Sequence, residues 1–264
     1  MTPQTARLDR DVDDLAGPGA LGLVGVPTQA ALLEALSAAL DRGEGFAVAT
    51  LNLDHIVKLR RDAAFRRAYA GQTHVVADGN PVVWLSRLSG REVALVPGSE
   101  LIAPLAALAA AKGVAIAALG STQPALRAAA ERLEADHPGL TVAACLAPPM
   151  GFNPESAAAD EMLDAVAASG ARICLLALGA PKQEILAVRG LARHPGLGFV
   201  SIGAGLDFVA GRQKRAPLWV RRIAMEWLWR MLSDPRRLAR RYLDCALVLP
   251  GLTVAALREG RGRT

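Results

Sequence analysis

The chain of 264 residues is poor in aromatic side chains, which make up 4% of it, and contains only three cysteines. Cys145, Cys174 and Cys245 lie far apart, and no pair has the spacing of metal ligands. This pattern favours buried, reduced thiols in a cytosolic protein over a disulfide framework or a zinc site. Ala, Leu, Val and Gly dominate instead, which favours helices packed on a buried sheet over an all-β sandwich.

Long apolar runs are missing as well. No stretch offers the roughly 18 consecutive apolar residues from which a membrane-spanning helix is built. The nearest candidate, residues 245–257, is too short and has Pro250 and Gly251 in its middle. The first 14 residues are polar and lack the apolar core of a signal peptide. We therefore expect a cytoplasmic protein without a spanning helix.

Familiar ligand motifs are absent too. No Gly-x-Gly-x-x-Gly follows the first predicted strand, and no P-loop occurs, which weakens interpretations as an NAD- or ATP-binding protein. The four histidines are scattered through the chain and form no metal-ligand motif: His55, His74, His137 and His194. We expect no cofactor and no dedicated metal site.

Charge is distributed unevenly along the chain. Residues 211–264 contain 13 Lys or Arg against 4 Asp or Glu, whereas residues 1–210 contain 17 against 21. A mildly acidic body is thus followed by a C-terminal segment of net charge +9. Such asymmetry indicates an anionic partner, of which nucleic acid, a phosphate-bearing substrate and an acidic membrane are the main classes.

Short apolar runs alternate with helical stretches through the body of the chain. Seven runs are predicted strands: residues 21–26, 46–52, 74–79, 114–120, 140–146, 172–179 and 198–203. They are continuously apolar, as in a parallel sheet covered on both faces, and the helices between them end at Gly or Pro-Gly. The alternation predicts an α/β fold: a Rossmann-like, mostly parallel, doubly wound sheet over residues 20–210, after a polar tail at 1–19.

Residues 211–264 are predicted to form a basic helical appendage. One helix is expected within residues 215–235, where Arg222, Glu226 and Arg230 have i, i+4 spacing and offset one another's charge. A second is expected to begin at Asp234-Pro235, an N-cap followed by Pro, and to stop at Pro250-Gly251.

The second of these helices carries four arginines with no acidic neighbour before Asp244: Arg236, Arg237, Arg240 and Arg241. They form a basic face beside Leu238, Tyr242 and Leu243, which is the profile of a helix lying on an anionic membrane. A solvated basic face and a contact with duplex DNA are the alternatives.

In an open parallel sheet, ligands bind beyond the carboxyl ends of the strands, so polar residues there are site candidates. Thr50 and Asn52 follow one predicted strand, and Asn52 is equally suited to capping the next helix. Asp78-Gly79 follows another. A partly desolvated carboxylate there suits general-base work, although a turn or cap role for Asp78 is an alternative of similar weight.

Two further strand ends carry polar or small residues. After residues 173–178 the chain reads Gly-Ala-Pro-Lys-Gln-Glu, in which Gly179 permits close approach of a ligand and Pro181 opens a helix. Lys182 adds positive charge at that helix N-terminus, which itself attracts anions, and Gln183 adds a donor and an acceptor. Glu184 also suits an ordinary first-turn acid. Gly203 begins a small-residue loop after the last strand.

Six segments occur here in the order in which a known family has them. They are TLNLDHIV, ADGNPVVW, VPGSEL, ALGAPKQE, SIGAGLDFVAGRQKRAP and MEWLWRMLSDPRRLARRYL. Together they resemble the WecG/TagA/CpsF glycosyltransferase family over about residues 20–245. One departure stands out: the family often has Arg and Asp where this chain has Leu95 and Glu100.

The resemblance implies an inverting, metal-independent enzyme without a cofactor. Such an enzyme moves N-acetylmannosamine or a related hexose from a UDP-sugar to a polyprenyl-diphosphate-linked sugar during synthesis of bacterial surface polysaccharide. It implies a peripheral position on the cytoplasmic face of the membrane, with the appendage closing over the site. A homo-oligomer is compatible with the sequence. The alternative, a nucleic-acid-binding protein that uses the basic helices, leaves the polar residues at the strand ends unexplained.

The resemblance also assigns residues. Asp78 matches the presumed catalytic base, Thr50 and Asn52 match pocket residues, and Gln183 matches the pocket glutamine. Arg215, with the Arg-rich appendage that contains Arg222, matches the region expected to reach the diphosphate. The remaining members of the predicted substrate-binding set are Gly79, Gly179, Pro181, Lys182 and Gly203. The predicted diphosphate- or membrane-contacting set is Arg236, Arg237, Arg240 and Arg241.

Overall fold

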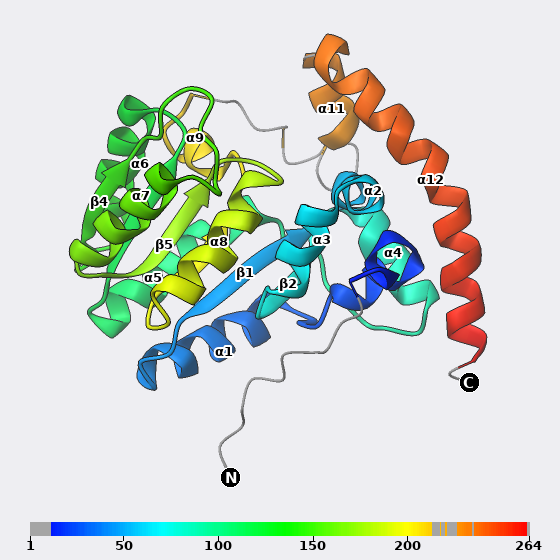
Figure 1. The fold of residues 1–264 in the computed structure, drawn as a ribbon, viewed down its shortest axis with the longest axis horizontal. Coiled ribbons are helices and arrows are strands. Elements are labelled where there is room, and N and C mark those ends of the chain that lie inside the picture. Colours follow the sequence, from blue (N-terminus) through cyan, green and yellow to red (C-terminus); the bar gives the residue numbers. More distant parts are fainter. Residues whose placement is uncertain (1–11, 213–216, 218–219, 221–225, 234, 263–264) are drawn as a thin grey trace.

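The computed structural model describes residues 12–212, 217, 220, 226–233 and 235–262 (Figure 1). Its centre is one sheet of six parallel strands in the order β2-β1-β6-β5-β3-β4. The strands are β1 (Phe46–Leu51), β2 (His74–Ala77), β3 (Ala115–Gly120), β4 (Val142–Leu146), β5 (Ala171–Ala177) and β6 (Gly198–Ser201). All six residues of β1 are buried, as expected for a strand covered on both faces. The predicted doubly wound, Rossmann-like fold is confirmed.

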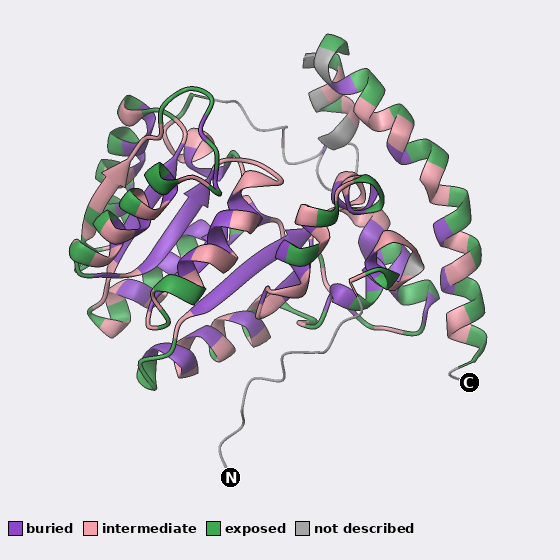
Figure 2. Ribbon diagram, viewed as in Figure 1, coloured by how far each residue is buried: buried purple, intermediate pink, exposed green. Residues whose placement is uncertain are grey.

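Helices cover both faces of the sheet (Figures 1 and 2). One face is covered by α1 (Gln29–Asp41), α5 (Ile102–Lys112), α6 (Gln123–Asp136) and α9 (Gly205–Val209). The opposite face packs against α7 (Ala157–Ala168) and α8 (Lys182–Arg193). Around the β1–β2 end lie α2 (Leu53–Arg61), α3 (Ala63–Ala70) and α4 (Asn80–Leu88). Three apolar clusters, one on each side and one at this end, therefore surround the sheet.

The first predicted strand is wrong. Residues 21–26 do not join the sheet, because Pro18–Leu23 form a 3-10 helix, η2, preceded by a second one, η1 (Asp14–Ala16). Leu15, Leu21 and Leu23 are nevertheless buried, within the cluster that contains α2 and α4. An apolar run of strand length can therefore pack into the core without pairing with a strand. Its periodicity alone does not distinguish it from a strand of the sheet. A third short turn, η3 (Gly98–Glu100), lies before α5.

The C-terminal helices are α11 (Glu226–Ser233) and α12 (Pro235–Arg261), and the described part of the chain contains no helix long and apolar enough to cross a membrane. The predicted stop at Pro250-Gly251 is wrong, since α12 continues through Pro250 to Arg261. Leu252 and Ala256 are fully buried against the body, and this burial offsets the hydrogen bond that Pro250 cannot donate. Helix α12 thus lies along α2 and α4 over most of its length (Figure 1).

Candidate active site

Thr50 and Asp78 meet at the carboxyl ends of β1 and β2. The two strands pair with Thr50 opposite Val76 and Leu51 opposite Ala77, so the residues that follow them are neighbours. The Thr50 hydroxyl donates to Asp78 Oδ2 at 3.4 Å, and the Asp78 backbone N–H donates to the Leu51 carbonyl at 2.8 Å. Thr50 is only 4% exposed, whereas Asp78 is of intermediate exposure, so the carboxylate lies at the boundary between the core and solvent.

Asn52 and Gly79 complete this corner. Asn52 is the N-cap of α2, where its Oδ1 accepts from the His55 N–H at 3.0 Å, so the capping role is observed. Gly79 precedes α4 with φ of 99°, a conformation that favours glycine. A Cβ there would meet Asn52 Cβ at 3.8 Å and Pro81 Cδ at 3.9 Å, which is ordinary van der Waals contact, so the positive φ and not a lack of space explains the glycine.

His55 and Tyr69 form a buried polar pair beneath this corner that sequence reasoning assigned no role. The Tyr69 hydroxyl donates to the Thr50 carbonyl at 2.8 Å, and His55 Nδ1 lies 2.7 Å from that hydroxyl and 2.9 Å from the same carbonyl. Burial lowers the pKa of His55 to about 3, so the imidazole is neutral at physiological pH, and burial raises the pKa of Tyr69. The available signal was the position of His55, one residue before the buried Ile56 on α2.

Gln183 lies where the loops after β5 and β6 meet, and it is 3% exposed. Its Oε1 accepts from the backbone N–H of Gly179 at 3.2 Å and from that of Gly203 at 3.1 Å. Its Nε2 donates to Glu184 Oε1 at 2.8 Å. Both glycines have positive φ, 71° and 58°, which explains their presence in these two loops. The structure therefore joins three predicted site residues through one amide.

Glu184 is fully buried, and its Oε2 has no hydrogen-bond partner among the described residues. Burial raises the pKa of this carboxyl to about 7, although the hydrogen bond from Gln183 acts in the opposite direction. The group therefore changes charge near neutral pH. A plain first-turn acid would instead be solvated, so this is a special environment.

A cavity of about 300 Å³ opens between the carboxyl ends of β3 and β5. It is lined by Ser121, Ala177, Leu178, Lys182 and the loop of residues 148–152. The chain leaves β3 toward β4 and β5 toward β6, so the two connections diverge here and the cavity lies at the switch point of the sheet. Lys182 is the first residue of α8, which directs a positive side chain and a helix N-terminus to the same place.

The wall of this cavity contains a second feature missed from the sequence. Ser121 has φ of 43°, which is uncommon for a residue other than glycine. Its hydroxyl donates to Asp207 Oδ1 at 2.5 Å, and Arg212 donates to the neighbouring Thr122 at 2.6 Å. The loop after β3 is thus connected to α9 and to the segment that follows it. Ser121 stands directly after Gly120, at which a Cβ would collide with the Ala177 carbonyl.

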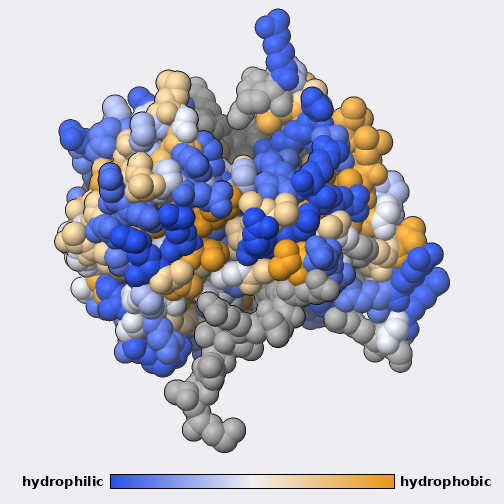
Figure 3. All heavy atoms as spheres, in the orientation of Figure 1, coloured by the Kyte–Doolittle hydropathy of each residue, from blue (hydrophilic) through white to orange (hydrophobic). Residues whose placement is uncertain are grey.

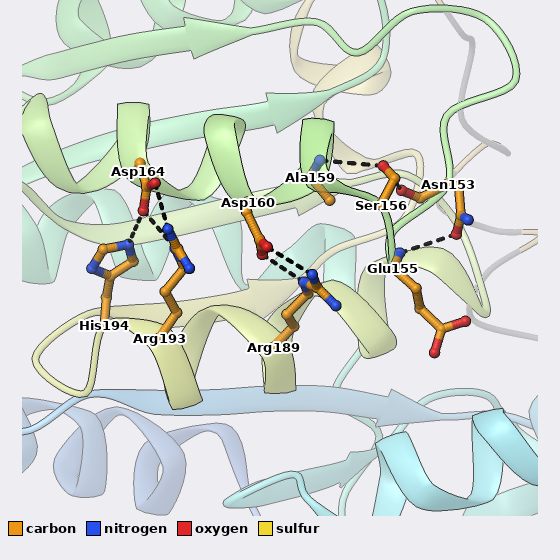
Figure 4. Close-up of polar contacts among 9 residues, drawn as sticks. All are labelled: Asn153, Glu155, Ser156, Ala159, Asp160, Asp164, Arg189, Arg193 and His194. Atoms are coloured by element: carbon orange, nitrogen blue, oxygen red, sulfur yellow. Dashed lines mark hydrogen bonds and ion pairs between the residues drawn. The ribbon is translucent and has the colours of Figure 1, made fainter.

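The far side of the cavity is formed by a loop that leads into α7. Ser156 caps the first turn of α7, where its Oγ accepts from the Ala159 N–H at 3.3 Å (Figure 4). Within the loop, Asn153 Oδ1 accepts from the Glu155 N–H. Helix α7 is fixed to α8 by two bidentate ion pairs, Arg189 with Asp160 and Arg193 with Asp164 (Figure 4). His194 joins the second of these at 2.9 Å. The Arg193 guanidinium and His194 lower the pKa of Asp164 to about 2.

Helix α12 reaches the edge of the site through ion pairs. Arg241 Nε lies 3.3 Å from Asp54 Oδ1, Lys58 Nζ lies 2.9 Å from Asp54 Oδ2, and Lys58 also donates to the Ala180 carbonyl at 3.3 Å. Arg241 therefore faces the body, whereas Arg236 and Arg240 are exposed. Arg215 and Arg222, and the side chain of Arg237, lie outside the described residues.

The order of the sheet separates two functional halves of this edge. Asp78 follows β2 and Thr50 lies near the end of β1, the cavity lies between β5 and β3, and the loops after β6 and β5 lie between them. Two strand spacings, about 10 Å, separate β1 from β5. Among the described residues, no group of three or more His, Cys, Asp or Glu is arranged to hold a metal ion.

Comparison with known proteins agrees with this arrangement. A curated relative from Bacillus spizizenii is 26% identical over 225 residues, which cover 84% of this chain and 82% of the relative. It is named N-acetylglucosaminyldiphosphoundecaprenol N-acetyl-beta-D-mannosaminyltransferase. The family model described as "Glycosyl transferase WecG/TagA/CpsF family" matches residues 22–263, that is, nearly the whole chain. With a doubly wound sheet, a polar strand-end cluster and this match, the chain belongs to the WecG/TagA/CpsF glycosyltransferase family.

Proposed function

We propose that this protein transfers N-acetylmannosamine, or a closely related hexose, from a UDP-sugar to a polyprenyl-diphosphate-linked sugar. The product serves cell-wall or exopolysaccharide synthesis, and the reaction inverts the anomeric centre without a metal ion. The observation that carries the proposal is the Asp78 carboxylate, held by Thr50 on the open edge of the sheet that also contains the cavity. The named activity of the Bacillus relative supports the sugar and the lipid-linked acceptor.

Asp78 acts as the general base in this mechanism. It takes the proton from the acceptor hydroxyl as that oxygen attacks the anomeric carbon from the face opposite UDP. The bond between the anomeric carbon and the diphosphate oxygen breaks, and the leaving UDP carries the electron pair. A single carboxylate is sufficient for such an inverting displacement, and the bond from Thr50 keeps the Asp78 carboxylate oriented.

The UDP group occupies the cavity beside β3 and β5. Lys182 lines this cavity, and the N-terminus of α8 adds positive potential, so both stabilise the charge that develops on the leaving diphosphate. Arg215 and Arg222 of the appendage are assigned to the same diphosphate. These cationic groups perform the task for which other glycosyltransferases use a divalent metal.

Helix α12 rests on the cytoplasmic face of the membrane, where the acceptor is anchored. Its outer face carries four exposed apolar side chains, spaced four, seven and three residues apart: Leu243, Leu247, Val254 and Leu257. The exposed Arg236 and Arg240 precede them on the same helix. Figure 3 shows hydrophobic surface along the edge of the molecule over this helix. An apolar stripe preceded by basic residues suits an interface with anionic lipid better than duplex DNA.

The test of the base is Asp78→Asn, assayed for UDP release with UDP-N-acetylmannosamine and a lipid-linked acceptor in the presence of EDTA. We expect the turnover to fall at least about 100-fold, as is usual when a general base is removed. Asp136→Asn, on the exposed end of α6, is the matched control and should keep wild-type turnover. An Asp78→Asn enzyme as fast as wild type would refute the assignment, and loss of wild-type activity in EDTA would refute metal independence.

A further inference from the structure

The two loops between the proposed base and the cavity are held together by the Gln183 side chain. Its Oε1 accepts from Gly179 in the loop after β5 and from Gly203 in the loop after β6. The Gln183 backbone N–H in turn donates to the Gly179 carbonyl at 3.2 Å. Because strands β5 and β6 are neighbours, one acceptor atom thus fixes the relative position of both loops.

This arrangement works in only one orientation of the amide. If the amide group turned over, its NH₂ would face two backbone N–H groups, and these part-buried donors would lose their partner. The two backbone donors favour the observed orientation, and so does the acceptor on the other side. That acceptor is Glu184 Oε1, 2.8 Å from Gln183 Nε2.

Glu184 cannot close a capping box at the start of α8. In a capping box, the side chain at the third helical position accepts from the N–H of the N-cap residue. The N-cap of α8 is Pro181, which has no N–H, so this bond is unavailable. The side chain instead faces inward, fully buried, and Gln72 Nε2 donates to the Glu184 carbonyl at 3.0 Å and holds this turn.

We propose that Glu184 is a positioning residue that sets the amide orientation of Gln183 and so locks the loops after β5 and β6 together. Resting on the proposed function, this assigns Glu184 no contact with substrate. It acts by fixing the relative position of the loops after β5 and β6, which lie between Asp78 and the cavity and across which the donor sugar must lie to react. Ground-state binding of UDP within the cavity depends on it much less.

The test compares three single variants of full-length protein and one double variant, Gln183→Met with Glu184→Met. Glu184→Met removes the acceptor at similar size, Glu184→Gln keeps an acceptor oxygen, and Gln183→Met removes the amide itself. Hydrogen exchange at the Gly179 and Gly203 amides reports the lock directly and needs no activity. Steady-state kinetics give kcat and the KM for UDP-sugar separately, and circular dichroism confirms that each variant is folded.

We expect Glu184→Met to speed exchange at both glycine amides at least about tenfold and to lower kcat by a similar factor, with KM for the donor changed less than threefold. Glu184→Gln should keep the wild-type rate of exchange at both glycine amides and the wild-type kcat. The double variant should be no slower than Gln183→Met alone, since the two residues act as one unit.

The proposal is overturned if the two glycine amides stay protected in Glu184→Met, or if the effects of Gln183→Met and Glu184→Met simply add. It is also overturned if Glu184→Gln is as impaired as Glu184→Met, because the carboxyl itself would then be needed. If the wild type shows no sugar transfer, the proposed function fails, while amide exchange still decides whether Glu184 orients Gln183.

Discussion

At the residue scale, Glu184 is a side chain whose charge changes near neutral pH. Its pKa of about 7 lies above the ordinary value of 4.5 because the carboxyl is buried. A carboxyl with a raised folded-state pKa favours folding at low pH, and that contribution is lost as the pH rises from about 4.5 through about 7.

Wild-type protein should therefore lose stability relative to Glu184→Gln as the pH rises from 4.5 to 8. The expected loss is about 3 kcal/mol, the free-energy equivalent of this pKa shift. Urea unfolding of both proteins at several pH values measures it, and the glutamine variant serves as the reference because it does not titrate. If the free energy of unfolding changed with pH in the same way for both proteins, this would contradict a buried carboxyl that ionises near pH 7.

Tyr69→Phe tests the polar pair beneath Thr50. The change keeps the edge-to-face packing on Phe65, whose ring centroid is 4.9 Å away, and removes the hydroxyl's bond to the Thr50 carbonyl together with its contact with His55 Nδ1. We expect a loss of about 1 kcal/mol in the free energy of unfolding and a several-fold fall in kcat, since Thr50 orients Asp78. Thermal unfolding and the UDP-release assay measure these, and wild-type values in both would show that the hydroxyl has no role.

The sequence located the residues at the strand ends because one rule, ligand binding beyond the carboxyl ends of parallel strands, selects them without three-dimensional information. Thr50, Asp78 and Gln183 were found in this way. The contact between Ser121 and Asp207 could not be, because it joins positions 86 residues apart. His55 escaped for a similar reason, since its partner Tyr69 lies on another helix.

Among the helices, α12 runs well past its predicted end. Proline usually ends a helix, but here the buried Leu252 follows Cys245 by seven residues, as Cys245 follows Leu238, and the buried Ala256 lies one turn further. The inner face therefore continues past Pro250, and tertiary packing outweighs the local preference of proline. Only knowledge of the surface against which α12 packs would have shown this.

Pro250→Ala should stabilise the protein by about 1–3 kcal/mol, because it restores a helical N–H donor at an exposed position. Chemical denaturation monitored by circular dichroism measures the change. Gly251→Ala, at the neighbouring exposed position, is the matched control for helix propensity alone and should add no more than about 1 kcal/mol. A destabilised Pro250→Ala would mean that α12 does not continue through this residue.

On the scale of the whole molecule, the proposed contact with membranes depends on the outer face of α12. Replacing both Arg236 and Arg240 by Gln should weaken binding to vesicles rich in phosphatidylglycerol about 30-fold, since each basic residue near such a surface contributes about 1 kcal/mol. Vesicle sedimentation measures this. Arg132→Gln, on the exposed face of α6, is the control and should bind as wild type.

Wild-type protein should bind neither neutral phosphatidylcholine vesicles nor duplex DNA at physiological salt. Salt-sensitive binding to DNA with no binding to anionic vesicles would favour the nucleic-acid alternative.

The overall organisation was the most predictable level. Alternating apolar runs fix the number and direction of crossovers, so six of seven strands and the parallel sheet were predicted. The packing of residues 14–23 was not, because an apolar run inserted beside a sheet has the same composition as a strand within it.

The ion pairs of Asp54 give the C-terminal helix a mechanical role. Arg241 on α12, Asp54 and Lys58 on α2, and the Ala180 carbonyl beside Gly179 form a continuous series of contacts. Displacing α12 from the body must break one of these contacts or pull on the loop after β5. Movement of α12 and movement of the loop after β5 are thus coupled through these contacts.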